Sequence, residues 1–302
     1  MSATLQAPRS TGALLPMAGP LADHWPQCEQ RLDTLEQLLK QLHFLEGHRL
    51  IHELLASSQY ADPLRLERFG RKVCSQQDED GILQEIFRRV GTSNRRFIEI
   101  GVGDGLENNT LNLLYAGWTG AWIDGSASDI ASIRSRFVEW LMERKLSARQ
   151  QFVTRENIDA LLASFEPPAD LDLLSIDVDG NDYHLWQATE SIRPRVVVIE
   201  YNARFAPPVR WVQACQSGRV WDGSDAFGAS LASLAALGTQ KGYALVGCTL
   251  TGVNAFFVRE DLAAGRFQKP FTAENFYQPP RYNLIKCFAD GHPRSFCSGL
   301  PL

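Results

Sequence analysis

An amphipathic helical pattern occupies the N-terminal part of the chain, from residue 25 to about residue 58. Apolar residues recur there at spacings of three and four, which places them on one face of an α-helix. The stripe comprises Leu32, Leu35, Leu38, Leu39, Leu42, Leu45, Ile51 and Leu55. We expect a helix or helix pair that covers the protein core or packs against a second copy in a homodimer. A helix lying on a membrane surface is disfavoured, because the polar face is not rich in Lys or Arg.

From residue 95 onward, short apolar runs alternate with helical patterns. The first five runs cover residues 97–102, 121–124, 151–154, 171–178 and 196–201. This alternation predicts βαβ units and a parallel sheet. A further helix is predicted from about residue 229 to 241, followed by a closing pair of strands at Tyr243–Cys248 and 254–258.

The pattern divides the chain into four parts. We expect a disordered tail (1–20), an N-terminal helical region (21–70), an α/β domain (71–268) and a C-terminal tail packed on that domain (269–302).

Composition narrows the functional classes. The chain has 302 residues, of which 44% are hydrophobic and 22% charged, as in ordinary globular proteins. A net charge of −5 argues against nucleic acid as the main partner, because phosphate binding needs a surplus of Lys and Arg. The sequence shows neither an apolar run of the roughly 20 residues that span a membrane nor a signal-peptide pattern. The six cysteines include no C-x-x-C pair, so we expect reduced thiols in a cytoplasmic protein.

A glycine-rich turn follows the first predicted strand. Gly101, Gly103 and Gly105 form a G-x-G-x-G pattern, which lets the backbone turn sharply and approach a ligand closely. Glu99 precedes the first glycine by two residues, and Asp124 ends the next strand, where a carboxylate can hold both hydroxyls of a ribose. Dinucleotide-binding enzymes use a similar acid, but their fingerprint has a glycine where this chain has Leu106. The pattern therefore favours S-adenosylmethionine over a dinucleotide as the cofactor. Asp124 does not distinguish the two, because both contain adenosine.

These motifs together resemble the class I methyltransferases, and more narrowly the FkbM-type enzymes. The resemblance covers residues 70–285 and rests on residues 75–83, 99–105, 108–110, 117–118, 124–126, 174–183 and 199–202. It implies an α/β, Rossmann-like fold: a seven-stranded, mostly parallel sheet with an antiparallel last strand and helices on both faces. It also implies S-adenosylmethionine as cofactor and, as acceptor, a sugar or secondary-metabolite hydroxyl.

The resemblance also implies a set of cofactor-binding residues. Glycines of the turn and Glu99 would line the methionine end, Asp124 and Ser126 would meet the ribose, and Asn157 would lie near the adenine. The full set is Glu99, Gly101, Gly103, Asp104, Gly105, Asn109, Asp124, Ser126 and Asn157.

Acidic residues follow two further predicted strands. Asp177 ends one strand, and Glu200 and Asn202 end the next. Ligands of parallel α/β sheets bind beyond the carboxyl ends of strands, so these three side chains would converge if the strands are neighbours. Three oxygen ligands suit Mg²⁺, which would bind two oxygens of the acceptor and lower the pKa of its hydroxyl. The spacing is similar to the metal motif of cation-dependent O-methyltransferases, except that a Tyr separates the acid from the Asn.

A mechanism without metal is the alternative. Asp177, Asp179 or His184 would then act as the general base. Residues 221–228 form a polar, glycine-rich and aromatic segment, which is either an ordinary loop or a lid over the acceptor with Trp211 or Trp221 as a stacking wall.

Several functions remain open. The leading hypothesis is O-methylation of a small molecule, with N-methylation as a variant. A dinucleotide-dependent oxidoreductase is disfavoured by the missing last glycine, and a non-catalytic binding protein by the intact turn and its acids. We expect a small-molecule acceptor as partner, and neither nucleic acid nor a membrane.

Overall fold

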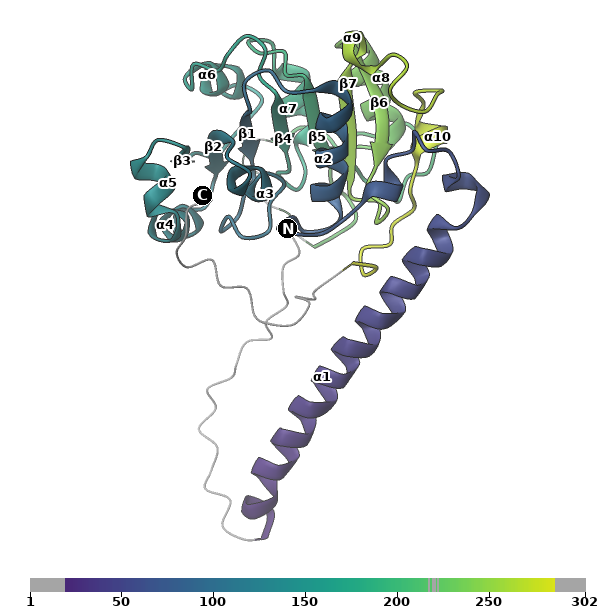
Figure 1. The fold of residues 1–302 in the computed structure, drawn as a ribbon. Helices are drawn as coiled ribbons and strands as arrows, with labels where there is room; N and C mark the ends of the chain where they lie inside the picture. The colour runs from purple at the N-terminus through teal and green to yellow at the C-terminus, as the bar shows by residue number, and fades with distance from the viewer. Residues whose placement is uncertain (1–19, 217, 219–220, 222, 286–302) are drawn as a thin grey trace.

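A seven-stranded sheet forms the centre of the computed structural model, which describes residues 20–216, 218, 221 and 223–285 (Figure 1). Residues 1–19 of the predicted N-terminal tail and residues 286–302 of the predicted C-terminal tail lie outside this part. The strands are β1 (Arg96–Ile100), β2 (Thr119–Asp124), β3 (Leu146–Gln150), β4 (Leu173–Ile176), β5 (Val196–Glu200), β6 (Tyr243–Cys248) and β7 (Asn254–Arg259).

The strand order is β3-β2-β1-β4-β5-β7-β6. Strands β1 to β5 pair in parallel, whereas β7 is antiparallel to both of its neighbours, β5 and β6. The order reverses between β1 and β4, which puts a topological switch point between their carboxyl ends. The expected seven-stranded, mostly parallel sheet is confirmed, with β7 as its antiparallel member.

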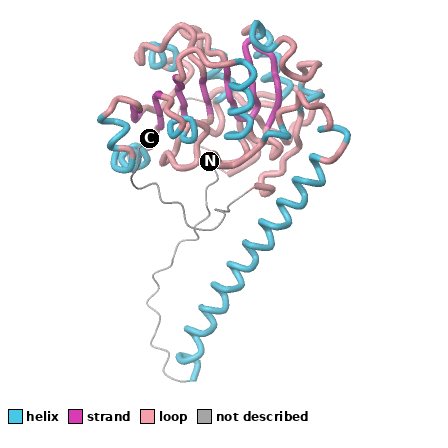
Figure 2. The backbone as a smooth tube through the Cα atoms, in the orientation of Figure 1, coloured by secondary structure: helices cyan, strands magenta, loops and turns pink. Residues whose placement is uncertain are grey.

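Helices cover both faces of the sheet because alternate strand residues point to opposite sides. In β5, Val196 and Val198 join one hydrophobic cluster, and Val197 and Ile199 join the other. The first face is covered by α2 (Glu79–Val90), α3 (Leu111–Tyr115), α4 (Ala127–Arg136), α5 (Val138–Met142) and α9 (Glu260–Ala263). The second face is covered by α6 (Ile158–Ala163), α7 (Asp182–Ala188), α8 (Leu231–Gln240) and α10 (Ala273–Phe276). Figure 2 shows the strands enclosed between these layers. The fold is Rossmann-like.

The third strand begins earlier than the sequence predicted. We expected it at residues 151–154, but β3 is Leu146–Gln150, and residues 151–154 form the loop that follows it. As an edge strand, β3 buries Leu146 and leaves its other side chains exposed or partly exposed, so it has little apolar character. The central strands are apolar in sequence because they are buried on both faces. Strand β3 is mostly not buried, so its sequence lacks this apolar pattern.

The N-terminal pattern forms a single helix, α1 (Pro20–Leu55), that extends away from the domain (Figure 1). Its leucine stripe is exposed, with Leu39 retaining 66% of its accessible surface. The helix therefore does not cover the core. Of the two roles expected from the sequence, packing against a second copy is the one still open. Among the described residues, no helix is both long and apolar enough to cross a membrane.

The described part of the C-terminal segment returns to the domain. Phe276 of α10 is buried in the core beside α8. The Tyr201 hydroxyl donates to the carbonyl oxygen of Gln278 at 2.7 Å, and the Tyr60 hydroxyl donates to Gln278 Oε1 at 2.7 Å. Short 3₁₀ helices, η1 (Ser58–Tyr60) and η2 (Glu67–Phe69), carry the chain from α1 into the domain.

Candidate active site

The glycine turn connects β1 to the edge of the sheet where the parallel strands end. Gly101, Gly103 and Gly105 all have positive φ, at 83°, 55° and 81°, which L-residues with side chains rarely adopt. The Gly101 amide donates to the carbonyl oxygen of Ile123 in β2 at 2.8 Å. A Cβ at Gly101 would lie 1.6 Å from the carbonyl oxygen of Asp177. The turn therefore depends on glycine both for its backbone conformation and for its approach to the end of β4.

Asp124 ties the glycine turn to the end of β2. Its Oδ2 accepts from the Gly103 amide and its Oδ1 from the Ser126 amide, both at 2.8 Å. Burial raises the pKa of this carboxyl above its usual value. Ser126 caps α4, because its hydroxyl oxygen accepts from the Asp129 amide. The carboxylate is held in a fixed orientation and retains lone pairs for a ligand.

One cavity of about 350 Å³ lies against these groups at the carboxyl edge of β1, β2, β3 and β4. This volume falls in the range of small-molecule sites, roughly 300–1,000 Å³. Its lining includes five of the predicted site residues, namely Gly101, Asp124, Ser126, Asp177 and Asp179. The remaining lining residues are Ile100, Gly125, Gln151, Phe152, Val153, Val178, Asn181 and Trp221.

Glu99 is buried behind the turn instead of facing the cavity. Its Oε1 accepts from the Asn109 amide at 2.8 Å, and its Oε2 accepts from the amide and hydroxyl of Thr110 at 3.1 and 2.5 Å. Burial raises the pKa of Glu99 to about 7. Glu99 thus holds the 108–110 loop and is absent from the cavity lining, so its predicted contact with the cofactor has no geometric support. The side-chain amide of Asn109 donates to the Ser175 hydroxyl at 3.0 Å, so it too is engaged by another residue of the protein.

Two other predicted cofactor residues also lie off the cavity. Asp104 is partly exposed, and its carboxylate pairs with Arg136 at 2.8 Å and accepts from the Leu106 amide. Asn157 connects the ends of its own loop, accepting from the Thr154 amide and donating to the carbonyl oxygen of Phe152. Asn157 thus holds its own loop and is absent from the cavity lining, so its predicted place near the adenine has no geometric support.

Gln151 and Phe152 are lining residues that the sequence did not single out. Phe152 keeps 40% of its surface exposed, which leaves part of its ring open at the cavity. They were missed because residues 151–154 were assigned to a strand, whereas Phe152 is the second residue after β3.

Three carboxylates gather at the ends of β4 and β5. Asp177 follows β4, Glu200 ends β5, and these strands are neighbours paired Ile176 to Ile199. One oxygen each of Asp177, Asp179 and Glu200 lies within 4.8 Å of the others. We refer to these three residues as the acid cluster. The predicted convergence of Asp177 and Glu200 is thus present.

The electrostatics of the acid cluster are unfavourable without a cation or protons. Burial, followed by repulsion from Asp177, raises the pKa of Glu200 well above its usual value. Burial also raises the pKa of Asp177 to about 6, and Asp179 adds to the rise. Asp177 Oδ1 and Glu200 Oε2 are buried without a hydrogen-bond partner among the described residues. Asp179 has a φ of 55°, so backbone strain is concentrated at the same place.

Asp182 positions the acid cluster and was not selected from the sequence. It accepts from the Val178 amide at 2.8 Å and from the Gly180 amide at 2.9 Å, and so fixes the loop that carries Asp177 and Asp179. Asp182 is the first residue of α7, and an acid at the start of a helix can accept from the backbone amides that precede it. This position is the feature of the sequence that could have identified it.

Asn202 does not join the acid cluster. Its amide donates to the carbonyl oxygens of Asp225 and Phe227 at 2.8 and 2.9 Å, and its Oδ1 accepts from the Arg204 amide. The side chain is fully buried and its oxygen is already used. Asn202 thus anchors the 225–227 loop, and its predicted role as a metal ligand has no geometric support. Asp179 lies with the other two carboxylates instead.

His184 is also engaged away from the cavity. Its Nε2 lies 2.7 Å from the carbonyl oxygen of Gln213, so it acts as a donor, and the residue is absent from the cavity lining. The general-base prediction for His184 therefore has no geometric support. Its contact instead joins α7 to the 205–230 segment.

That segment brings Trp221 to the cavity. The Trp221 indole lines it and donates through Nε1 to the carbonyl oxygen of Ser224 at 2.7 Å. Trp211 instead stacks on Phe205, with ring centroids 4.5 Å apart. Of the two predicted stacking walls, Trp221 is the one placed for that role.

Comparisons with known proteins find similar solved structures at low sequence identity. The chain matches no protein-family model, and a search of curated proteins finds no match. Among solved structures, it is similar to an O-methyltransferase from Bacillus cereus in complex with SAH, with 15% identity over 72% of this chain and 90% of that chain and a TM-score of 0.36. It is also similar to the glycopeptide N-methyltransferase MtfA, with 14% identity over 60% and 90% of the two chains and a TM-score of 0.35. A third is the O-methyltransferase NcsB1 from neocarzinostatin biosynthesis, with 16% identity, 59% and 52% coverage and a TM-score of 0.36.

The sheet itself carries the structural conclusion. Its seven strands, its antiparallel last strand β7 and its glycine turn after β1 are those expected from the sequence. The chain has a Rossmann-like fold.

Proposed function

We propose that this protein is an S-adenosylmethionine-dependent methyltransferase that methylates a hydroxyl group of a small molecule. One observation carries the proposal: one cavity is lined by Gly101 and Asp124 and also by two members of the acid cluster, Asp177 and Asp179. The glycine turn and Asp124 suit a cofactor that contains adenosine. The acid cluster suits a polar acceptor whose hydroxyl must lose a proton. A FkbM-type enzyme acting on a sugar or secondary metabolite is the narrower form of this proposal.

On the cofactor side, Asp124 would accept from the ribose hydroxyls, since its backbone donors leave further lone pairs free. Phe152 and Val153 would supply an apolar surface for the adenine. Gly101 and Gly103 would let the methionine portion lie close to the backbone. The cofactor supplies an activated methyl group on its sulfonium, so the protein's main tasks are alignment and preparation of the nucleophile.

The helix that follows the turn argues against a dinucleotide. In dinucleotide-binding folds, the glycine turn leads directly into a helix whose N-terminus meets the pyrophosphate. Here α3 begins at Leu111, six residues beyond Gly105, and the intervening residues form a loop. The turn therefore has no adjacent helix N-terminus to offer a phosphate.

On the acceptor side, the acid cluster fits a divalent cation such as Mg²⁺. Its ligands are hard oxygen atoms, and the buried oxygens of Asp177 and Glu200 lack hydrogen-bond partners. A cation at this place would supply Lewis acidity that lowers the pKa of a bound hydroxyl. In the alternative without a cation, Asp177, whose pKa burial raises to about 6, would accept the proton of the acceptor hydroxyl. Acceptors with two adjacent oxygens, such as catechols or sugar diols, match this arrangement.

The test is transfer of a labelled methyl group from S-adenosylmethionine to a panel of catechols, sugar diols and matched amines. We expect O-methylated product with Mg²⁺ present, a loss of at least about 100-fold in Asp177→Asn, and no loss in Glu139→Gln, an exposed acid on α5. Transfer that is confined to amines, or that survives Asp177→Asn, would contradict the proposal.

A further inference from the structure

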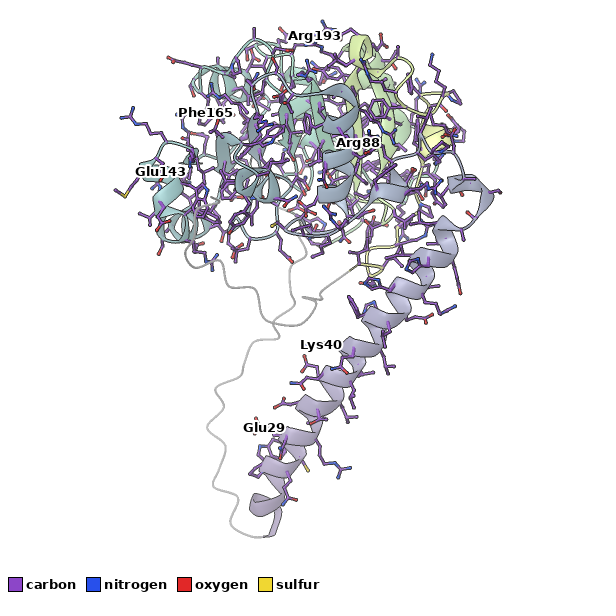
Figure 3. The ribbon with its side chains drawn as sticks, in the orientation of Figure 1. Glu29, Lys40, Arg88, Glu143, Phe165 and Arg193 are labelled. Atoms are coloured by element: carbon purple, nitrogen blue, oxygen red, sulfur yellow. The ribbon has the colours of Figure 1, made fainter. Side chains whose placement is uncertain are left out.

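The projecting part of α1 carries an apolar surface that nothing described in this chain covers. Residues 25–43 are all exposed, and Leu32 and Leu39 keep 65% and 66% of their surface. Figure 3 shows Glu29 and Lys40 on this part, well away from the domain. Helices in proteins owe most of their stability to packing, and contiguous apolar patches mark interaction sites. This surface therefore needs a partner.

The apolar residues follow a heptad repeat. If Leu32 is assigned to position a, alternating steps of three and four residues place apolar residues at every a and d position over three heptads. The seam comprises Trp25, Cys28, Leu32, Leu35, Leu39 and Leu42. A seam of this period makes helices supercoil around each other with interlocking side chains. The next a and d positions are Glu46 and Arg49, which pair with each other on the same helix, so the seam ends at Leu42 after about 27 Å.

The flanking charges indicate a second copy of the same helix, in parallel orientation. Arg31 occupies position g and Glu36 the following position e, which face each other across a parallel dimer. Arg31 would thus meet Glu36 of the partner subunit, twice by symmetry. Glu36 pairs with Lys40 of its own helix through Oε1, which leaves Oε2 for this contact. An antiparallel pair would set e beside e, and both Glu29 and Glu36 occupy that position.

The domain leaves the seam open. It meets α1 at Gly47, whose Cβ position lies 2.6 Å from the carbonyl oxygen of Leu284, and at His43, whose Nε2 lies 2.8 Å from the carbonyl oxygen of Asn283. Gly47 and His43 occupy positions b and e, to the side of the a and d residues. We propose that α1 forms a parallel two-stranded coiled coil with α1 of a second copy, which brings two domains to the same end of the coil.

The first test is the oligomeric state of the full chain by sedimentation velocity. We expect a dimer that dissociates in Leu35→Lys with Leu39→Lys, with a dissociation constant raised about 100-fold or more. Gln37→Lys with Gln41→Lys is the matched control, because it adds the same two charges with the same spacing at positions f and c. Circular dichroism verifies that both variants keep the fold. A monomeric wild-type chain, or a dimer that survives the seam variant, would overturn the proposal.

The second test measures orientation. A parallel coil places Cys28 beside Cys28 of the partner subunit in the same layer, within reach of a short bis-maleimide cross-linker. We expect a covalent dimer that is lost in Cys28→Ser and retained in Cys215→Ser, which removes another exposed thiol. A dimer that does not cross-link through Cys28 would refute the parallel arrangement.

Discussion

Gly101 and Asp177 come from different strands and meet at the switch point of the sheet. The carbonyl oxygen of Asp177 occupies space that a Cβ on Gly101 would need, with 1.6 Å between the two. The Asp177 amide in turn donates to the carbonyl oxygen of Ile100 at 3.0 Å. This contact joins the cofactor side of the cavity to the acid cluster, so the two halves of the proposed site share one rigid support.

We expect Gly101→Ala to lower the free energy of unfolding by about 3 kcal/mol, because it adds a backbone clash to an unfavourable φ. Gly117→Ala is the matched control: its φ is 82°, but no atom lies within 4 Å of the added Cβ. Gly117→Ala should lower the free energy of unfolding by only about 1 kcal/mol, because an L-residue there must adopt a positive φ. Urea unfolding measures both, and equal losses in the two variants would show that the contact with Asp177 is unimportant.

A divalent cation should raise the melting temperature of the protein, and more strongly at higher pH. Protons compete with the cation for the acid cluster, and the raised pKa of Asp177, about 6, places that competition between pH 5 and 7. We therefore expect Mg²⁺ or Mn²⁺ to stabilise the protein at pH 7.5 and to have little effect at pH 5. Scanning calorimetry with and without chelator provides the measurement.

Glu200→Gln should abolish this stabilisation, whereas Glu139→Gln should preserve it, since Glu139 is exposed on α5 away from the acid cluster. A shift that is the same at both pH values, or that persists in Glu200→Gln, would place the cation elsewhere.

In the absence of cations, Asp177→Asn should stabilise the protein at alkaline pH. The pKa of Asp177 is raised in the folded state, so its stabilising contribution is present at pH 4 and is lost as pH rises through about 6. Asn carries no charge, and the Oδ1 atom it retains has no hydrogen-bond partner to lose. We expect a gain on the order of 2 kcal/mol at pH 8 and almost none at pH 4, by urea unfolding in chelator. A variant that is less stable at pH 8 would contradict this assignment.

Asn202→Ala separates a structural anchor from a metal ligand. The side chain is fully buried and its amide holds two carbonyl oxygens of the 225–227 loop, so we expect a loss of about 2–3 kcal/mol in the free energy of unfolding. The cation-dependent shift in melting temperature should remain. Loss of that shift with unchanged stability would restore Asn202 to the ligand set.

The central strands were predictable because burial leaves a direct mark on sequence. Strand β5 is Val-Val-Val-Ile-Glu, buried on both faces up to its last residue, and its terminal acid arrives at the carboxyl edge as expected. Strand β3 has one buried residue and gave no comparable signal, which displaced the prediction by several residues. The same displacement left Gln151 and Phe152, which line the cavity, without a predicted role.

Site residues were predictable by position but not by orientation. Motif and strand ends placed Asp124, Asp177 and Glu200 at one edge of the sheet. The sequence could not show that the side-chain oxygens of Glu99 and Asn202 accept hydrogen bonds from backbone amides. Those amides belong to loops whose geometry depends on the complete fold. Asp179 was selected only as a base, and its placement among the candidate ligands depends on a left-handed backbone conformation.

Calorimetric titration of the purified protein with S-adenosylhomocysteine, beside NAD⁺, tests the central claim most directly. We predict one-site binding of S-adenosylhomocysteine, no binding of NAD⁺, loss of affinity in Asp124→Ala and unchanged affinity in Glu139→Gln. Binding of NAD⁺, or no binding of S-adenosylhomocysteine by the folded protein, would contradict the assignment of the glycine turn and of the function built on it.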